Sequence, residues 1–102
     1  MDEDDYRDDG YEWSEAKSAD RMARSGFDFH AARRVLESDR YVERWDERHS
    51  GLDEERVVAT GMLGPAYISV VYTPRGSRKR IISAFEADDD DIADFMVTYA
   101  LE

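Results

Sequence analysis

The sequence predicts an α+β fold: a curved antiparallel sheet of about four strands, with two N-terminal helices and a C-terminal helix. Two observations lead to this class. Segments 14–26 and 28–38 carry apolar residues at helical spacing, whereas segments 56–63, 66–73 and 78–85 are rich in β-branched and aromatic residues and are separated by turn sequences. Helices and strands that are grouped in this way are typical of α+β domains.

The chain begins with an acidic segment, residues 1–9, that has almost no apolar side chains. This composition is typical of disordered segments, so we predict a disordered acidic tail over 1–9 and a single domain over 10–102. Order is expected to begin near residues 11–13, which read as a short strand.

Two helices are expected next. Ser14 is a suitable N-cap for the first, Gly26 is a suitable C-terminal stop, and Asp28 is a suitable N-cap for the second. The expected inward-facing residues are Ala16, Ala19, Met22 and Ala23 in the first helix, and Phe29, Ala32, Val35 and Leu36 in the second.

The remaining strands follow from period-two alternation and turn residues. Segment 40–45 alternates as a strand, and the three β-rich runs are joined by Gly64 and Pro65 and by the turn at 74–77. They are therefore expected to form an antiparallel meander. The four aspartates at 88–91 suit the start of a C-terminal helix, because its macrodipole favours negative charge there, and are expected to be solvated.

The net charge of -11 lies at the two ends of the chain. Residues 1–9 carry -5 and residues 88–102 carry -6, so residues 10–87 are neutral and can present a local cationic face. The 12 arginines against 2 lysines, beside 15 aspartates and 10 glutamates, fit two explanations. One is a halophilic protein whose acidic surface keeps it soluble, and the other is a GC-rich codon bias.

Several classes of site are not expected. The absence of cysteine excludes disulfides and thiolate metal sites, and His30 and His49 are isolated, so we expect no metal and no cofactor. No apolar run approaches the roughly 20 residues that span a bilayer, and the N-terminus lacks the features of a signal peptide. A cytoplasmic protein without a membrane partner is therefore expected.

Basic residues gather in the meander. Alternation along the last strand places Lys79 on the face opposite to its two neighbouring arginines. Guanidinium groups bind phosphates bidentately, and Tyr72 and Tyr67 could stack on bases. Arginines at turns and strand ends are also ordinary surface residues that protect sheet edges. The candidate phosphate-binding residues are Arg56, Arg75, Arg78 and Arg80.

Five short stretches follow one another at a specific spacing: "YEWSEAK", "GFDF", "EERVVATG", "VVYTPRG" and "RIISA". In this order they resemble the BrnT family, small RelE-like ribonuclease toxins of type II toxin–antitoxin systems. The resemblance implies metal-independent RNA cleavage, in which the ribose 2′-OH attacks the adjacent phosphate and arginines stabilise the transition state. It also implies an RNA substrate and a ribbon-helix-helix antitoxin that neutralises the toxin and carries the complex to operator DNA. The catalytic residues expected are Arg56, Arg75 and Arg80, and the RNA-binding residues expected are Lys17, Arg78, Lys79 and Tyr72.

The chain departs from the family pattern after "IISA". The family usually continues with two basic residues, whereas this chain has Phe85 and Glu86. An apolar residue on the former active face suits a protein contact. The alternative function is therefore a catalytically silent BrnT-like protein that acts by binding an antitoxin or another protein.

Overall fold

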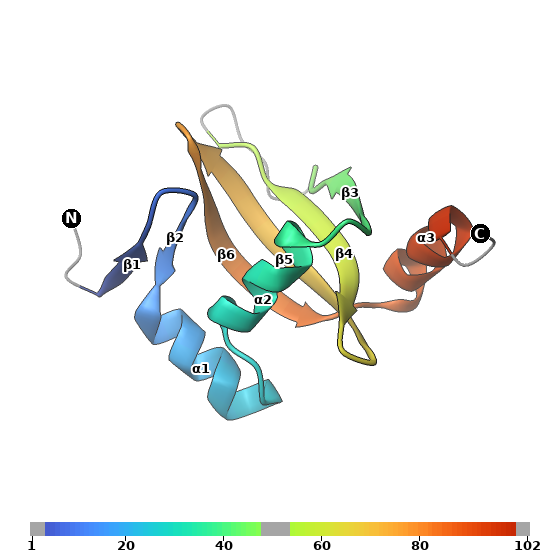
Figure 1. The fold of residues 1–102 in the computed structure, drawn as a ribbon, viewed down its shortest axis with the longest axis horizontal. Helices are drawn as coiled ribbons and strands as arrows, with labels where there is room; N and C mark the ends of the chain where they lie inside the picture. The colour runs from blue at the N-terminus through green and yellow to red at the C-terminus, as the bar shows by residue number, and fades with distance from the viewer. Residues whose placement is uncertain (1–3, 48–53, 100–102) are drawn as a thin grey trace.

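Six strands and three helices form the described part of the chain, residues 4–47 and 54–99, in the computed structural model (Figure 1). The strands make one sheet in the order β1-β2-β6-β5-β4-β3. The strands are β1 (Asp5–Arg7), β2 (Tyr11–Ser14), β3 (Tyr41–Trp45), β4 (Val57–Leu63), β5 (Ala66–Arg75) and β6 (Arg78–Glu86), and the helices are α1 (Glu15–Ser25), α2 (Phe29–Glu37) and α3 (Asp89–Tyr99).

The α+β class is confirmed, but the expected sheet of about four antiparallel strands is wrong. The meander β4-β5-β6 is antiparallel as predicted, and β3 joins its edge. Two strands precede the helices, so the helices are not the N-terminal elements: β2 contains the short strand expected at 11–13, and β1 was not expected. β2 pairs in parallel with β6, which makes the sheet mixed. Local periodicity does not reveal this pairing, because β1 and β2 are three and four residues long and their partner lies far along the chain.

Residues 4–9 lie in the segment expected to be a disordered tail, and the structure differs from that expectation. Asp5–Arg7 forms β1, and the ring of Tyr6 stacks on Trp13 at a centroid distance of 4.3 Å. The carboxylate of Asp8 accepts the N–H groups of Gly10 and Tyr11 at 2.9 and 2.8 Å, which closes the hairpin turn. A stacked ring and a capping carboxylate thus contribute to ordering a segment of polar composition. Residues 1–3 lie outside the described part.

The core lies between α2 and the sheet face that we call the inner face (Figure 1). All four predicted inward-facing residues of α2 are buried. They pack with Trp13 of β2 and with apolar residues of β4, β5 and β6. Helix and sheet approach closely at Gly61, where a Cβ would lie 3.0 Å from Val35 Cγ1 and 3.1 Å from the carbonyl oxygen of Arg40.

Helix α1 begins and ends where the sequence predicts, but it packs differently. The Ser14 hydroxyl accepts the N–H of Lys17 at 3.3 Å, and Gly26 ends the helix in the left-handed conformation with φ of 80°. The predicted apolar stripe is exposed. The buried residue of α1 is Ser18, whose hydroxyl accepts the N–H of Phe29 at 2.9 Å. The contact with α2 is therefore anchored by a buried hydrogen bond.

Helix α3 packs on the opposite, outer face of the sheet, beside β3 and β4. The ring of Phe95 lies edge-on to Tyr67 at 5.6 Å, and the hydroxyl of Tyr99 donates to the carbonyl of Tyr41 at 2.8 Å. Side chains of the central strands on this face, such as Val58, Val71 and Thr73, are also buried. Among the described residues, no helix is both long and apolar enough to cross a membrane.

Candidate nucleic-acid interface

A hollow of about 390 Å³ opens on the outer face and crosses four strands. We call it the outer hollow. Its apolar walls come from β4, β5 and β6, and its charged groups come from β3, from the residue after β3 and from the residue before β4. The lining residues are Arg44, Asp46, Arg56, Val58, Val71, Ile82, Ser83 and Phe85.

The strand register explains why these side chains meet. Arg44 pairs with Val58, Val58 pairs with Val71, and Val71 pairs with Ser83. Directly opposed residues on neighbouring strands project from the same face of a sheet. A row of side chains thus runs from an arginine on the edge strand, across two valines, to a serine on β6.

Arg56 lies in the outer hollow, immediately before β4. Its carbonyl accepts the N–H of Asp46 at 2.9 Å, which holds the end of β3 beside the start of β4. Its Nη2 lies 3.6 Å from Oε2 of Glu54, and 30% of its side chain is exposed. The sequence singled out this residue, and the structure places it at a hollow with apolar walls.

Arg44 lines the same hollow and was not among the expected site residues. Its Nε and Nη2 donate to the two carboxylate oxygens of Asp91, at 2.7 and 3.2 Å. This contact raises the pKa of Arg44, so the guanidinium remains charged. Period-two alternation places Arg44 on the face opposite Glu43 and Trp45, but only its pairing with Val58 shows that this face carries the hollow.

Asp91 corrects the expectation that the aspartates at 88–91 are all solvated. Three of them are exposed, whereas Asp91 is buried. It also accepts the Ser69 hydroxyl at 3.3 Å, and the Ser69 oxygen lies 2.7 Å from that of Thr60. The carboxylate thus accepts from a hydroxyl of β5, which is itself paired with a hydroxyl of β4, and from a guanidinium of the edge strand.

Arg80 does not line the outer hollow; carboxylates of the N-terminal hairpin hold it. Its Nη1 and Nη2 donate to Asp5 at 3.1 and 3.2 Å, and Nη1 also donates to Glu12 at 3.0 Å. These hydrogen bonds raise the pKa of Arg80, and the bond from Arg80 lowers the pKa of Asp5. Only 19% of the Arg80 side chain is exposed. The contacts fasten β1 and β2 to β6.

Arg75 and Arg78 face each other at the end of the β5–β6 hairpin. Arg75 is exposed, whereas the Nε of Arg78 donates to the carbonyl of Asp8 at 2.6 Å. Strand alternation puts both on the outer face together with Arg80, but beyond the residues that line the hollow.

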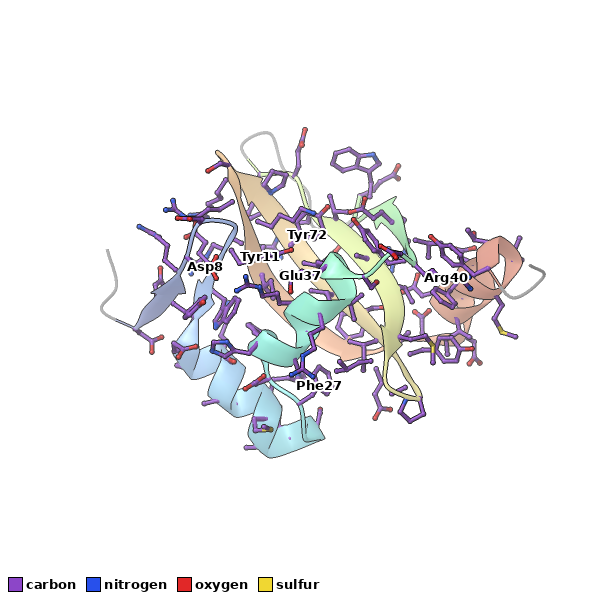
Figure 2. All side chains as sticks on the ribbon, viewed as in Figure 1. Asp8, Tyr11, Phe27, Glu37, Arg40 and Tyr72 are labelled. Atoms are coloured by element: carbon purple, nitrogen blue, oxygen red, sulfur yellow. The ribbon has the colours of Figure 1, made fainter. Side chains whose placement is uncertain are left out.

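Tyr72 lies on the inner face, where it belongs to the core (Figure 2). Strand alternation puts Lys79 on the same face, opposite to its neighbours Arg78 and Arg80. The Tyr72 hydroxyl donates to the carboxylate of Glu43, and burial, followed by this contact, raises the pKa of the tyrosine. Nζ of Lys79 lies 5.1 Å from the centroid of the Tyr72 ring. The lysine and the ring thus form a cation–π contact within the protein.

Lys17 lies on another hollow, of about 530 Å³, between α1 and β6. Ile82 and Ser83 line both hollows, so β6 forms the wall between them. Of the seven expected site residues, the outer hollow therefore contains Arg56 alone.

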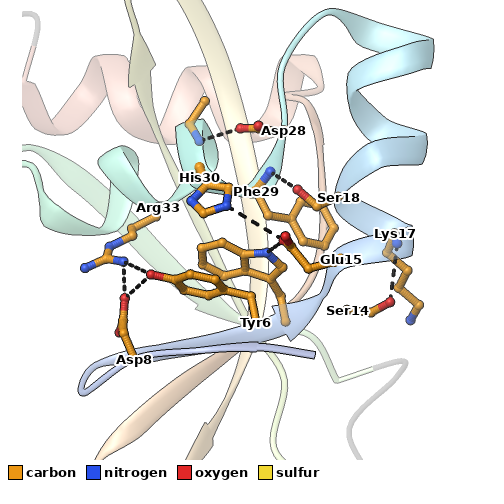
Figure 3. A network of polar contacts seen from close by, with 12 residues as sticks. Tyr6, Asp8, Ser14, Glu15, Lys17, Ser18, Asp28, Phe29, His30 and Arg33 are labelled. Carbon is orange, nitrogen blue, oxygen red and sulfur yellow. Dashed lines mark hydrogen bonds and ion pairs between the residues drawn. The ribbon is translucent and has the colours of Figure 1, made fainter. Parts of the chain in front are cut away.

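A polar network on the inner side joins the N-terminal hairpin to α2 (Figure 3). Tyr6 and Arg33 both donate to the carboxylate of Asp8, and Arg33 also contacts the ring of Tyr11 at 4.5 Å. The Tyr6 hydroxyl, followed by the amides of Gly10 and Tyr11 and by Arg33, holds the pKa of Asp8 far below its ordinary value. The network stabilises the hairpin.

His30 belongs to the same structural region. Its Nε2 lies 3.7 Å from Oε1 of Glu15, which also accepts the indole N–H of Trp13 at 2.8 Å (Figure 3). Its ring packs edge-on against Trp13 at 4.7 Å. Within residues 4–47 and 54–99, no group of three or more histidine, cysteine or acidic side chains is placed to hold a metal ion. His49 lies outside the described residues.

The chemistry of the outer hollow fits a nucleotide better than a purely ionic ligand. Arg44 and Arg56 provide charged donors for phosphate oxygens. Ile82 and Phe85, which are half-buried, provide apolar surface on which a base can pack, and Val58 and Val71 are buried. An unpaired nucleotide presents both kinds of surface at once.

Most of the chain, including the outer hollow, also matches a known protein family. Residues 13–91 match the family model described as a ribonuclease toxin, BrnT, of type II toxin-antitoxin systems. The match covers every residue that lines the outer hollow, ends at Asp91, and begins after β1. No curated protein sequence matches the chain.

Proposed function

We propose that this chain, which belongs to the BrnT family of ribonuclease toxins of type II toxin–antitoxin systems, cleaves RNA in the outer hollow. The observation that carries the proposal is the position of Arg56. It is the one expected catalytic arginine that lies in a hollow with apolar walls on the outer face of the sheet.

The reaction we propose is transphosphorylation. The 2′-oxygen of the ribose attacks the adjacent phosphorus and the bond to the 5′-oxygen breaks. The 5′-oxygen leaves as a hydroxyl with a proton from water, and a 2′,3′-cyclic phosphate remains. Negative charge increases on the phosphate oxygens in the transition state, where a fixed guanidinium such as that of Arg56 stabilises it. The 2′-OH loses its proton to a base, for which we propose Asp46, the carboxylate among the lining residues.

The other expected residues take different parts in this proposal. Arg75, exposed at the end of the β5–β6 hairpin, would contact a neighbouring phosphate of the RNA. Arg80 is assigned to the structure, because its guanidinium is bonded to Asp5 and Glu12. Lys17 lines the neighbouring hollow, and we propose that it contacts another part of the RNA.

Membership of a type II toxin–antitoxin family implies an antitoxin partner. We propose that the antitoxin is of the ribbon-helix-helix type, that it neutralises the toxin by covering the outer hollow, and that it carries the complex to operator DNA. The hollow on the outer face supports this arrangement, because it offers a recess that a segment of the antitoxin can fill.

The test is cleavage of RNA by the purified protein and its Arg56→Ala variant, at about 0.1 M and about 3 M KCl, since salt screens surface charge within a few ångströms at the higher concentration. We expect the variant to lose roughly 10²- to 10³-fold in rate, the usual effect of removing one transition-state donor. Arg24→Ala is the matched control, because Arg24 is an exposed arginine on α1, 71% exposed and paired with Asp20. Cleavage that persists in Arg56→Ala would disprove the site.

Phe85 favours a second candidate function, a silent protein that acts by binding. An aromatic ring in the hollow offers apolar surface for a protein segment. Absence of cleavage at both salt concentrations, from a folded protein that still binds the antitoxin encoded beside it, would support this candidate against the nuclease.

A further inference from the structure

We infer that Arg44 is a second phosphate-binding residue of the outer hollow and that Asp91 is the residue that positions it. The inference deepens the proposed function and rests on it, because it assigns the phosphate of the same RNA substrate to a residue that the sequence did not indicate. It is carried by a single constellation, in which a buried carboxylate orients a half-exposed guanidinium at the hollow.

The burial of the two partners is very unequal. The Asp91 side chain is 4% exposed, whereas that of Arg44 is 45% exposed and lines the hollow. Asp91 is held from several directions: its backbone N–H donates to Asp88 Oδ1 at 2.9 Å, and its carboxylate accepts from Ser69 and Arg44. The carboxylate is therefore the fixed partner, and the arginine is the exposed group that it orients.

The geometry leaves part of the guanidinium for a second anion. Asp91 takes two N–H donors of Arg44, those on Nε and Nη2, of the five that the group carries. A planar guanidinium held along one edge loses little further freedom when its other edge binds a phosphate. Arg44 and Arg56 are the two cations among the lining residues, so a phosphate bound in the hollow would lie near both guanidinium groups.

A purely structural explanation also exists for this ion pair. The contact joins the edge strand β3 to the start of α3, and these segments are 47 residues apart in the chain. That explanation accounts for the burial of Asp91, and it predicts that substitutions affect stability alone. The two explanations therefore differ in what happens to RNA binding.

The experiment measures binding of a fluorescent RNA oligonucleotide in which 2′-deoxy positions prevent cleavage, over a range of salt concentrations. The variants are Arg44→Ala, Arg44→Lys and Asp91→Asn, with Arg24→Ala as the control. We expect Arg44→Ala to bind roughly tenfold more weakly and to lower the salt slope by about 1, the result of losing one phosphate contact. Asp91→Asn should also bind more weakly, but with the wild-type salt slope, because it retains the cation and loses only its orientation. Arg44→Lys should keep the slope and recover part of the affinity.

Unchanged affinity and slope in Arg44→Ala, or no RNA binding by the wild-type protein, would overturn the inference. Thermal unfolding confirms that each variant is folded, and the two Arg44 variants decide the question if Asp91→Asn does not fold. Cleavage assays separate this inference from the proposed function. Loss of cleavage in Arg56→Ala with full cleavage and binding in Arg44→Ala rejects the inference alone, whereas binding through Arg44 without cleavage rejects the nuclease alone.

Discussion

The arginines of the outer face differ in how many carboxylates they contact, and this number separates structural arginines from those that can bind a ligand. Arg80 binds two carboxylates and is 19% exposed, whereas Arg44 binds one and is 45% exposed. A guanidinium that is paired twice and largely withdrawn from water has few donors left for an external anion. A sequence motif cannot distinguish these arginines, because the deciding carboxylates lie in other elements.

Arg80→Ala should therefore lower stability. The substitution removes the hydrogen bonds that Asp5 and Glu12 accept from the guanidinium, whereas the buried Glu12 keeps its ion pair with Arg7. We expect a loss of about 2 kcal/mol in the free energy of unfolding, the usual range for charged hydrogen bonds. Urea unfolding measures it, with Arg75→Ala as the exposed control, expected within about 0.5 kcal/mol of the wild type. Equal stabilities of the two variants would contradict the structural assignment of Arg80.

Asp8 gives a pH dependence whose sign follows from its lowered pKa. The hydroxyl of Tyr6, two backbone amides and Arg33 stabilise the ionised form in the folded state. The resulting stabilisation is complete above 3.8, the ordinary pKa, and is lost as the pH falls from there toward the folded value. Thermal unfolding should be measured from neutral pH to below pH 3.8. Asp8→Asn should be less stable than the wild type near neutral pH, and the difference should shrink in acid. A difference that is constant with pH would contradict this.

At the scale of elements, polar contacts anchor helix α1 and the β1–β2 hairpin to the rest of the fold. Helix α1 buries a serine in place of its predicted stripe, and the β1–β2 hairpin is held by Asp8, Arg33 and Arg80. By contrast, α2 follows the expected pattern closely, since its four apolar residues face the core. Elements that pack through polar contacts are those for which hydrophobic periodicity was least informative.

The close approach of α2 to β4 predicts that Gly61→Ala destabilises the protein. An added methyl would lie 3.0 Å from Val35 Cγ1 and 3.1 Å from the backbone carbonyl of Arg40, which has little room to move. Overpacking of this kind costs about 1–3 kcal/mol. Gly10→Ala is the matched control, because a Cβ there meets nothing within 4 Å. Chemical denaturation of both variants measures the effect, and equal midpoints would show that the contact is not tight.

At the scale of the molecule, the terminal acidic segments do more than add charge. The N-terminal segment contributes Asp5 and Asp8 to buried or half-buried contacts, and the C-terminal aspartates contribute Asp91. The remaining aspartates of 88–91 are exposed, as expected of a solvated helix start. The net charge of -11 therefore overstates the negative charge that faces a ligand on the outer face.

The sequence alone was sufficient for the caps of α1 and α2, the inward face of α2, and the β4-β5-β6 meander. Each of these depends on interactions between residues a few positions apart, or on turns that join neighbouring strands. The parallel pairing of β2 with β6, the ordering of β1, the withdrawal of Arg80 and the meeting of Arg44 with Asp91 required the folded chain. These depend on carboxylates and strands up to 75 residues away, and no local pattern encodes which of many like-charged side chains will be brought together.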